Sequence, residues 1–367
     1  METSHIEPEH ISKPRRRQAS RSTMLSTEQV RQYHAVRQGA ALIDRHDRGR
    51  ILLRGNDRKT FLHALLTNDV AMLAPNTGCY AALLTPQGRM ISDLRVFELG
   101  DVTVLDVPGE TRAAVLAKLD QMLFSEDVQI ADMTDALGCA SVQGPAAAAL
   151  LGRVFGVGGA GAPGLADQLM GWAEYHNVRG DLGGDMGILA RVDEFGMPGH
   201  FVFAPPGRLP AMAAAMAAAG AVVVDPEVCN ALRIESGTPQ FGADMTGDTI
   251  PTEAGIDPRA VSYIKGCFPG QEVLVRIRDR GHGKVARKLV GILVEGSVEP
   301  MSGDIIRAAA KDVGAVTSAA WSPGMNAPIA LGYVHREHAA SGTALEIARG
   351  EQLLAARVTD LPFVGPA

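Results

Sequence analysis

Apolar and polar residues alternate along this chain with two different periods, and together these periods predict a mixed α+β fold. Short apolar runs that end in Gly, Asn or Asp predict strands, whereas apolar residues three or four positions apart predict helices. Strands are predicted over 49–55, 79–84, 90–99, 102–107, 140–143, 186–192 and 201–204, and helices over 57–66, 110–124, 145–154 and 210–219. Because strands followed by a helix occur in two rounds, the pattern predicts two α+β subdomains.

The pattern changes from Lys284 onward, where short strand-like runs are separated by Gly and Pro and little helix is expected. This composition predicts a small all-β barrel or sandwich. We therefore expect a disordered leader at residues 1–26, a unit of two α+β subdomains at 27–283 and a β-barrel domain at 284–367. The leader is polar and contains three glutamates, and the start of translation can lie at Met1 or at Met24.

Composition narrows the classes of function. The chain has 367 residues, of which 46% are hydrophobic and 21% charged, as in ordinary globular proteins. A net charge of −6 argues against a general nucleic-acid binder, and no apolar run approaches the roughly 20 residues of a membrane span, so neither partner is expected. The four cysteines are far apart and include no C-x-x-C pair, which predicts neither a disulfide framework nor a stable metal site and suits a reducing compartment.

Two further motifs resemble a nucleotide-binding loop and a metal site in spacing, but each lacks the context that such a site requires. Gly156–Gly161 fits G-x-G-x-x-G, but a dinucleotide loop must follow a strand, and this run follows a predicted helix. We interpret it as a flexible linker. His335 and His338 have no third ligand nearby in sequence, so we interpret this segment as a solvated loop.

The most informative segment is Lys265–Glu272, which reads KGCFPGQE. A thiol reacts as its thiolate, and the neighbouring cation of Lys265 favours that form of Cys267. The glycines on either side allow a sharp turn or the close approach of a ligand. The residues alone leave two interpretations open, because a free cysteine is often simply a small buried side chain.

Other charged positions have similar alternatives. Asp93 lies inside a predicted strand, where an unpaired buried carboxylate is costly, so it faces either solvent or a polar cavity. On a strand, Arg276, Arg278 and Arg280 would share one face and form a basic stripe beside Cys267. Such a stripe is either a solvated edge strand or a site for an anion or an acidic partner.

The run KGCFPGQE resembles the signature of the YgfZ-type folate-binding proteins, which are relatives of the T-protein (aminomethyltransferase) of the glycine cleavage system. Further runs similar to that superfamily follow in order: 41–44 with 49–51, 84–94, 232–237, 250–255, 287–291 and 330–334. The resemblance implies an α+β protein with three subdomains in a ring around a central, folate-sized hole. Two of these are α+β subdomains and the third is the C-terminal β-barrel.

The chain also departs from the T-protein pattern. Ser92 and Asp93 stand where the T-protein typically has two folate-contacting aspartates. Residues 191–203 resemble the T-protein stretch whose glutamate holds the pterin ring, but Met197 and Pro198 occupy the acidic positions. A thioether cannot accept the paired hydrogen bonds that a pterin offers to a carboxylate. This difference leaves open whether the chain is an enzyme.

The resemblance gives a set of candidate site residues. The reactive pair is Cys267, as the thiol, and Lys265, as its activator; candidate folate-binding residues are Asp93, Arg191, Arg233, Glu253, Gln271 and Glu272. Two of these have alternatives: Glu253 lines the hole or caps a helix, and Arg233 pairs with Glu235 or with a folate glutamate tail. No stable metal is expected, and at most a transient metal contact at Cys267.

The function that the resemblance implies is that of a tetrahydrofolate-binding accessory factor for assembly or repair of [4Fe–4S] clusters. Its partners would be folate, iron–sulfur assembly proteins and client enzymes, including tRNA-modifying ones, in the bacterial cytoplasm or the mitochondrial matrix. The alternative is a tetrahydrofolate-dependent aminomethyltransferase or another one-carbon transferase. A third interpretation is a folate-binding protein in which Cys267 is structural. The folate form, the chemical step and the oligomeric state stay open at this stage.

Overall fold

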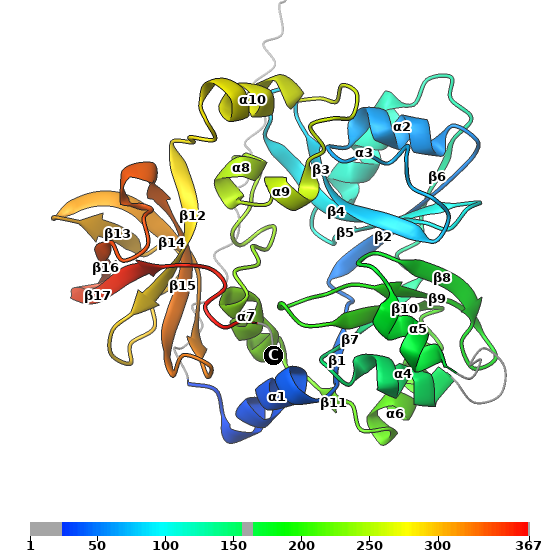
Figure 1. Ribbon diagram of the computed structural model, residues 1–367, viewed down its shortest axis with the longest axis horizontal. Coiled ribbons are helices and arrows are strands. Elements are labelled where there is room, and N and C mark those ends of the chain that lie inside the picture. Colours follow the sequence, from blue (N-terminus) through cyan, green and yellow to red (C-terminus); the bar gives the residue numbers. More distant parts are fainter. Residues whose placement is uncertain (1–23, 156–163, 366–367) are drawn as a thin grey trace, which may run out of the picture.

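The structure is a computed structural model that describes residues 24–155 and 164–365. Most of the expected leader and the run Gly156–Gly161 lie outside the described residues. Figure 1 shows three parts: two sheets with their helices, one above the other on the right, and a barrel on the left. Short helices lie between the sheets and the barrel.

Five antiparallel strands form the first sheet, in the order β3-β4-β5-β2-β6. Their bounds are β2 Arg48–Arg54, β3 Thr77–Leu84, β4 Met90–Glu98, β5 Thr103–Pro108 and β6 Gln129–Asp132. Helices α2 (Arg58–Leu65) and α3 (Arg112–Met122) pack on one face through a core that includes Phe61, Leu94 and Leu119. Alternate residues of each strand therefore point either to these helices or to the opposite face.

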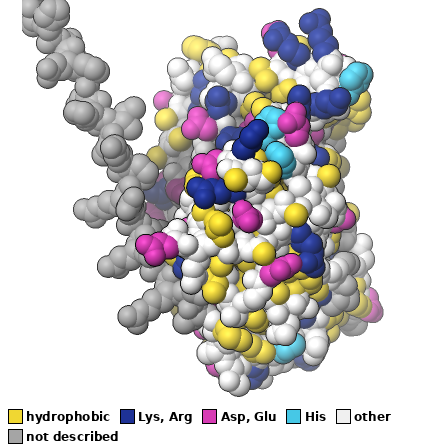
Figure 2. All heavy atoms as spheres, turned by 90° about the vertical axis from the view of Figure 1, so that its left-hand side faces the viewer, with side chains coloured by type: hydrophobic (Ala, Val, Ile, Leu, Met, Phe, Trp, Pro, Cys, Tyr) yellow, Lys and Arg dark blue, Asp and Glu magenta, His cyan; other side chains and the backbone are white. Residues whose placement is uncertain are grey.

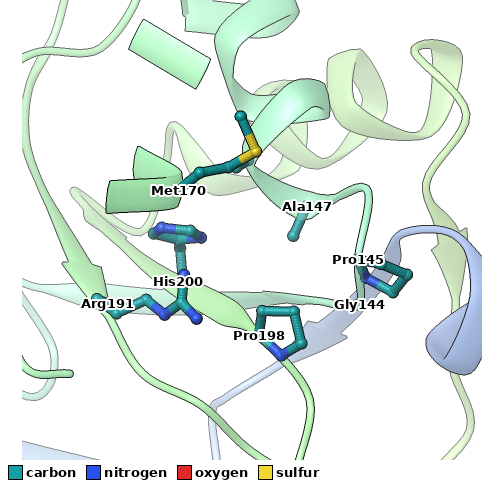
Figure 3. Close-up of a pocket in the computed structure, with 8 residues that line it drawn as sticks. Gly144, Pro145, Ala147, Met170, Arg191, Pro198 and His200 are labelled. Atoms are coloured by element: carbon teal, nitrogen blue, oxygen red, sulfur yellow. The ribbon is translucent and has the colours of Figure 1, made fainter. Parts of the chain in front are cut away.

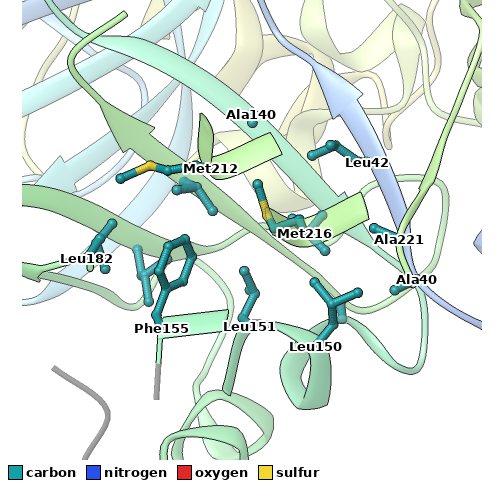
Figure 4. Packing of buried hydrophobic residues seen from close by; sticks show 14 of the residues in the cluster. Ala40, Leu42, Ala140, Leu150, Leu151, Phe155, Leu182, Met212, Met216 and Ala221 are labelled. Atoms are coloured by element: carbon teal, nitrogen blue, oxygen red, sulfur yellow. The ribbon is translucent and has the colours of Figure 1, made fainter. Parts of the chain in front are cut away.

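The second sheet has six strands in the order β11-β1-β7-β10-β9-β8. Their bounds are β1 Ala41–Asp44, β7 Gly138–Gln143, β8 Asn177–Asp181, β9 Met186–Arg191, β10 Gly199–Ala204 and β11 Val222–Val223. Helices α4 (Ala147–Phe155), α5 (Leu165–Gly171) and α6 (Leu209–Ala218) cover one face. Figure 4 shows the apolar core between this face and the helices, with Leu151 and Met216 at its centre.

The chain enters the second sheet before it builds the first. Strand β1 pairs with β7 and with β11, which lie about 100 and 180 residues later in the chain. The two predicted α+β subdomains are confirmed, and the strands and helices behind that prediction are confirmed within a few residues. The pairing of β1 with β7 and β11 was not predicted. Sequence periodicity cannot detect such pairing because it registers only neighbours along the chain.

Helix α1 (Thr27–Gln38) begins with a capping box between Ser26 and Gln29. It packs on α7 (Pro226–Glu235) through a core that includes Tyr33 and Leu232. The connection from α7 to the barrel carries α8 (Pro251–Ala254), α9 (Asp257–Ala260), α10 (Gln271–Val275) and a π-helix at Arg276–Arg280.

Six strands close into the C-terminal barrel, in the order β12-β15-β14-β13-β16-β17. Their bounds are β12 Arg287–Val294, β13 Ile305–Ala308, β14 Lys311–Ser322, β15 Ala327–His335, β16 Ala344–Arg349 and β17 Gln352–Thr359, with a 3-10 turn at Arg336–His338. The outside of the barrel packs on α7, where Ala231 and Ile234 contact Ile329 and Leu331. The expected fold class, two α+β parts and a C-terminal barrel, is confirmed. No helix of the described residues is long and apolar enough to cross a membrane.

Candidate functional site

The two sheets face each other through an aromatic layer. Phe97 of β4 meets Phe203 of β10 edge to face, with 5.7 Å between the ring centroids, and Phe201 lies 5.9 Å from Phe203. Because side chains alternate along a strand, the face of β4 that carries Phe97 also carries Asp93 and Arg95. These charged residues therefore point into the layer between the sheets.

Five charged residues form an inter-sheet cluster: Arg45, Arg48, Arg95, Asp106 and Glu194. Asp106 is fully buried and accepts from Arg48 Nε at 2.6 Å and from Arg95 Nη1 at 2.8 Å. Arg95 Nη2 donates to Glu194 Oε1 at 3.2 Å, and Arg45 lies 3.6 Å from the same oxygen. Arg45 also pairs with Asp47, at 3.3 Å, so three guanidinium groups face three carboxylates and their charges balance.

Both carboxylates of this cluster stay ionised in spite of their burial. Burial by itself would raise the pKa of Asp106, but the charges of Arg48 and Arg95 outweigh it and hold that pKa below its usual value. The pKa of Glu194 is lowered in the same way by Arg45 and Arg95, against the effect of burial. The layer between the sheets is therefore permanently charged at neutral pH.

Asp93 lies in the same layer and is only partly paired. It is 9% exposed, and its Oδ2 accepts from Tyr80 Oη at 2.9 Å. Its Oδ1 is buried and has no hydrogen-bond partner among the described residues. Burial, followed by the charge of Asp93, raises the pKa of Tyr80, so the phenol keeps its proton and donates it to Oδ2. Asp93 thus presents one free acceptor.

Three parts of the molecule meet around Asp93. Tyr80 comes from β3, and the guanidinium of Arg259 from α9 lies 5.4 Å from the centroid of its ring. Arg259 Nη2 also donates to Tyr175 Oη at 2.9 Å, and Tyr175 lies two residues before β8 of the second sheet. Contacts between these three residues fix the two sheets and α9 relative to one another at this point.

Met197, which the sequence resemblance placed at the position of the T-protein's pterin-binding glutamate, is a core residue. It is 1% exposed and packs in the same cluster as Tyr33 and Phe195. The turn that carries it has positive φ at Phe195 (59°) and Gly196 (67°). A buried carboxylate does stand three positions earlier, at Glu194, but it is already paired within the inter-sheet cluster.

Arg191 is not brought together with Asp93. On β9, Ile188 and Ala190 pack toward the first sheet, whereas Leu189 packs under the helices on the opposite face. Alternation places Arg191 on the same face as Leu189. Arg191 therefore points to the helix-covered face of the second sheet, whereas Asp93, on the first sheet, points to the other face.

Arg233 joins α7 to the barrel. Its Nη1 donates to Asp244 Oδ2 at 2.6 Å and its Nη2 to Ser318 Oγ at 2.7 Å. The pairing with Glu235 that the sequence left open is not formed, because Glu235 accepts instead from Tyr33 and from Ser322. In this structure the guanidinium of Arg233 is engaged within the protein.

Glu253 joins α8 to the barrel in a similar way. Its Oε2 accepts from Arg287 Nε at 3.1 Å, and the Arg287 guanidinium lies 4.7 Å from the centroid of the Tyr333 ring. The Glu253 side chain is 11% exposed, so this pair is mostly shielded from water on the carboxylate side.

The segment 265–272 docks on the turn between β3 and β4. Gly270 has φ +83°, and a β-carbon there would lie 2.7 Å from Thr85 O and 2.8 Å from the α-carbon of Gly88. Gly88 has φ +74°. Positive φ favours glycine at both positions, and at Gly270 the backbone of the facing turn also leaves no room for a β-carbon. This contact holds the Cys267 loop in place, and Phe268 adds a buried ring.

Lys265 and Cys267 point to different surroundings. Lys265 Nζ donates to the carbonyl oxygens of His63 and Leu66, at the C-terminal end of α2. Burial lowers the pKa of Lys265 to about 8, and the charge of Asp69 opposes part of this shift. Cys267 is exposed and makes no hydrogen bond to Lys265. The structure therefore shows no contact through which Lys265 would activate the thiol of Cys267.

Cys267 is the exposed one of the four cysteines. Burial raises the pKa of Cys79 and of Cys229 to about 12, and it raises the pKa of Cys139 as well. A neutral, buried thiol is a poor nucleophile. We therefore expect Cys267 to be the cysteine that reacts in the folded protein.

The prediction of a strand carrying Arg276, Arg278 and Arg280 is wrong. These residues form the π-helix that continues α10, so they do not share one face in the expected way. Arg276 pairs with Glu272 at 2.9 Å and Arg278 with Asp279 at 2.6 Å. Figure 2 shows basic side chains gathered at the upper end of the molecule, where Figure 1 places α10. Gln271 begins this helix.

Metal-binding groups do not gather in the described part of the chain, where no three His, Cys, Asp or Glu side chains are placed to hold an ion. His335 ends β15 and lies 3.7 Å from Glu337, and His338 ends the 3-10 turn.

Sequence reasoning missed the whole inter-sheet cluster and also Tyr80 and Tyr175, the two tyrosines near Asp93. The signal was present: Arg95 and Asp106 interrupt otherwise apolar strands, as Asp93 does. The sequence could not show that these two residues form a pair, because they come together only when β4 and β5 align with Arg95 directly opposite Asp106.

Comparison with known proteins agrees with this architecture. The chain matches the GCVT N-terminal domain over residues 9–263 and the glycine cleavage T-protein C-terminal barrel domain over residues 287–365. It is 30% identical over 332 residues to an aminomethyltransferase of Rubrobacter xylanophilus, covering 90% of this chain and 85% of the relative. It is also 30% identical over 315 residues to an aminomethyltransferase of Streptomyces coelicolor, covering 84% and 82%.

The fold also matches a solved structure. The crystal structure of the glycine cleavage system aminomethyltransferase T from Bartonella henselae superimposes with a TM-score of 0.81 at 23% identity, covering 92% of this chain and 89% of that one. Both domains of the family are therefore present, in order, over nearly the whole described length. The chain belongs to the aminomethyltransferase family of the glycine cleavage T-protein.

Proposed function

We propose that this protein binds tetrahydrofolate in the layer between its two sheets, with Asp93 as the principal acceptor for the pterin. The observation that carries the proposal is the free Oδ1 of Asp93, a buried oxygen without a partner among the described residues. A buried acceptor left unpaired costs about 1–3 kcal/mol, and the ring N–H and amino groups of a pterin are suitable donors. The family to which the chain belongs supports folate as the ligand.

The residues around Asp93 fit this role. Tyr80 orients the carboxylate through Oδ2, which leaves Oδ1 for the ligand. Arg259 and Tyr175 hold the neighbouring surfaces together, so the site is assembled before a ligand arrives.

For the reaction, we propose one-carbon transfer of the aminomethyltransferase kind, the activity named in the relatives at 30% identity. When bound, tetrahydrofolate would supply the nitrogen atoms that accept the one-carbon unit. The protein's own part is to bind and orient the pterin through Asp93 and to exclude water between the sheets. Because Met197 offers no carboxylate, this orientation depends on Asp93 more than in the T-protein pattern.

A second candidate function is that of a YgfZ-type accessory factor for [4Fe–4S] enzymes, including those that modify tRNA. The observation that favours it is the exposed Cys267 in a loop held by the contact between Gly270 and Gly88. One thiol cannot hold a four-iron cluster, which usually takes four thiolates. Any cluster would therefore be shared with an iron–sulfur assembly protein or a client enzyme.

One experiment with three readouts separates these functions. Tetrahydrofolate binding to the purified chain tests the Asp93 site and is expected in both cases. Release of a one-carbon unit from an aminomethylated carrier protein tests the transferase. Restoration of [4Fe–4S] enzyme activity in cells that lack their own YgfZ-type protein, by wild type and by Cys267→Ala, tests the accessory role. Absence of folate binding would contradict both functions.

A domain boundary at residues 283/284 and a cytoplasmic or mitochondrial location stay predictions. The first strand of the barrel begins at Arg287, which is compatible with that boundary.

A further inference from the structure

A small cavity lies on the helix-covered face of the second sheet, away from Asp93. Its volume is about 220 Å³, and it is bounded by the start of α4, by α5 and by β9 and β10. The lining residues that matter here are Pro145, Ala147, Met170, Arg191, Pro198 and His200. Figure 3 shows His200 and Arg191 on one side of the cavity, with Met170 above them and the two prolines across from them.

His200 lines this cavity and has a buried ring nitrogen without a hydrogen-bond partner among the described residues. The residue is 1% exposed, and its Nε2 donates to the carbonyl oxygen of Leu169 at 3.2 Å, since a carbonyl can only accept. Burial, with a contribution from Arg191, lowers the pKa of His200 to about 4, so the ring is neutral at pH 7. Nδ1 then carries a lone pair, and it has no partner among the described residues. A ligand with an N–H or O–H group would satisfy it.

Arg191 and the first turn of α4 bring positive charge to the same cavity. Arg191 donates through Nε and Nη2 to Asp193, at 2.5 and 3.1 Å, which leaves Nη1 without a partner within the described ranges. The N-terminal end of the nine-residue helix α4, from Ala147, adds a partial positive charge. Asp193 compensates part of the charge on Arg191, so we expect binding of an anion to be weak.

We propose that this cavity is a second ligand site, for a small carboxylate that also carries an N–H or O–H donor, such as a short amino acid or hydroxy acid. The carboxylate would lie at Arg191 Nη1 and the start of α4, and the donor would meet His200 Nδ1. Pro145, Ala147 and Pro198 limit the size of the ligand. This site is independent of the proposed folate site, because β9 and β10 separate the two.

The test is a titration of the full chain, followed by NMR or calorimetry, with glycine, glycolate and acetate. For ligands of about five non-hydrogen atoms, dissociation constants in the millimolar range are expected. Acetate has no donor for His200, so it should bind about two- to tenfold more weakly than glycolate. A preference for glycine over glycolate would identify an amine as the donor, and the reverse would identify a hydroxyl.

Two variants make the test specific. Arg191→Met should weaken binding about tenfold or more, because it removes the charge-assisted bond. Arg179→Met is the matched control, since Arg179 also pairs with an aspartate, its Nη2 donating to both carboxylate oxygens of Asp101 at 2.9 and 3.0 Å, and does not line the cavity. Met170→Trp, at a 58% exposed position, should block the cavity without disturbing the core, and Met186→Trp, at 61%, is its control.

The proposal is overturned if none of the three probes binds, if Arg191→Met binds like Arg179→Met, or if Met170→Trp binds like Met186→Trp. Binding of tetrahydrofolate should be the same in all four variants. A loss of folate binding in Arg191→Met alone would place the cavity within the folate site and would also overturn the proposal of a separate one.

Discussion

Replacing Asp93 by Asn tests the centre of the proposed folate site. The substitution keeps the size of the side chain and leaves an amide oxygen that can still accept from Tyr80. It removes the negative charge and turns the second oxygen into an N–H donor. That donor would face the pterin's own donors, so the free acceptor at Oδ1 is lost.

The size of the effect follows from the kind of bond that is lost. Hydrogen bonds to charged groups contribute about 1.5–3 kcal/mol, which corresponds to an increase in Kd of roughly 10- to 150-fold. The stability of the protein should change little, because Oδ1 has no partner to lose. Calorimetric titration with tetrahydrofolate under anaerobic conditions measures the first quantity, and urea denaturation measures the second.

Asp248→Asn is the matched control, because that carboxylate is 87% exposed and pairs only loosely with Arg89 at 3.4 Å. It should bind folate like the wild type. If Asp93→Asn also bound folate with unchanged affinity, Oδ1 would not be the pterin's acceptor and the site would have to be moved. A large loss of stability in Asp93→Asn would show that Oδ1 is satisfied within the fold.

Three more predictions follow from the segment 265–272 and its surroundings. Gly270→Ala should lower the free energy of unfolding by about 1–3 kcal/mol in urea denaturation, since its β-carbon would meet Thr85 O at 2.7 Å and φ is +83°. Burial lowers the pKa of Lys265 from 10.5 to about 8, so between these pH values the folded chain binds fewer protons than the unfolded chain. The free energy of unfolding of the wild type should therefore rise with pH over this window, relative to Lys265→Met. A thiol reagent at neutral pH should modify only Cys267 in the folded protein, and the other thiols only on unfolding.

Each of these predictions has its own control. Gly283→Ala has φ +73° and open space around it, so it isolates the backbone strain from the clash at Gly270; equal losses in both variants would argue against the docking contact. A constant difference between wild type and Lys265→Met from pH 8 to 10.5 would mean that Lys265 titrates as it does in the unfolded chain. Continued rapid labelling of folded Cys267→Ala would mean that a second thiol is accessible.

The sequence by itself determined the local elements and the family. Helix Arg58–Leu65 and strands Thr77–Leu84 and Met90–Glu98 were predicted within two or three residues, because their apolar spacing reflects one buried face. The run KGCFPGQE and the ordered similarities along the chain identified the superfamily. Asp93 was a candidate because burying an unpaired carboxylate inside an apolar strand is costly.

Only the tertiary structure decided what each charged side chain contacts. Lys265 meets the carbonyl of Leu66, 199 residues away, and Glu194 meets Arg95 across the two sheets, 99 residues away. The periodicity of a sequence records which face of an element is buried, but not which element covers it. It therefore could not show that Arg191 faces a separate cavity with His200 rather than Asp93.

The same limit explains the failed strand at Arg276–Arg280. Alternating charged and other residues are compatible with an edge strand and with a short exposed helix. In the structure Gly270 docks beside Gly88, and helix α10 begins at the next residue, Gln271. Local sequence thus indicated which apolar residues are buried, because apolar side chains gain free energy when they leave water. Pairing across the fold fixed which of them form a site, because a hydrogen bond needs both partners in place.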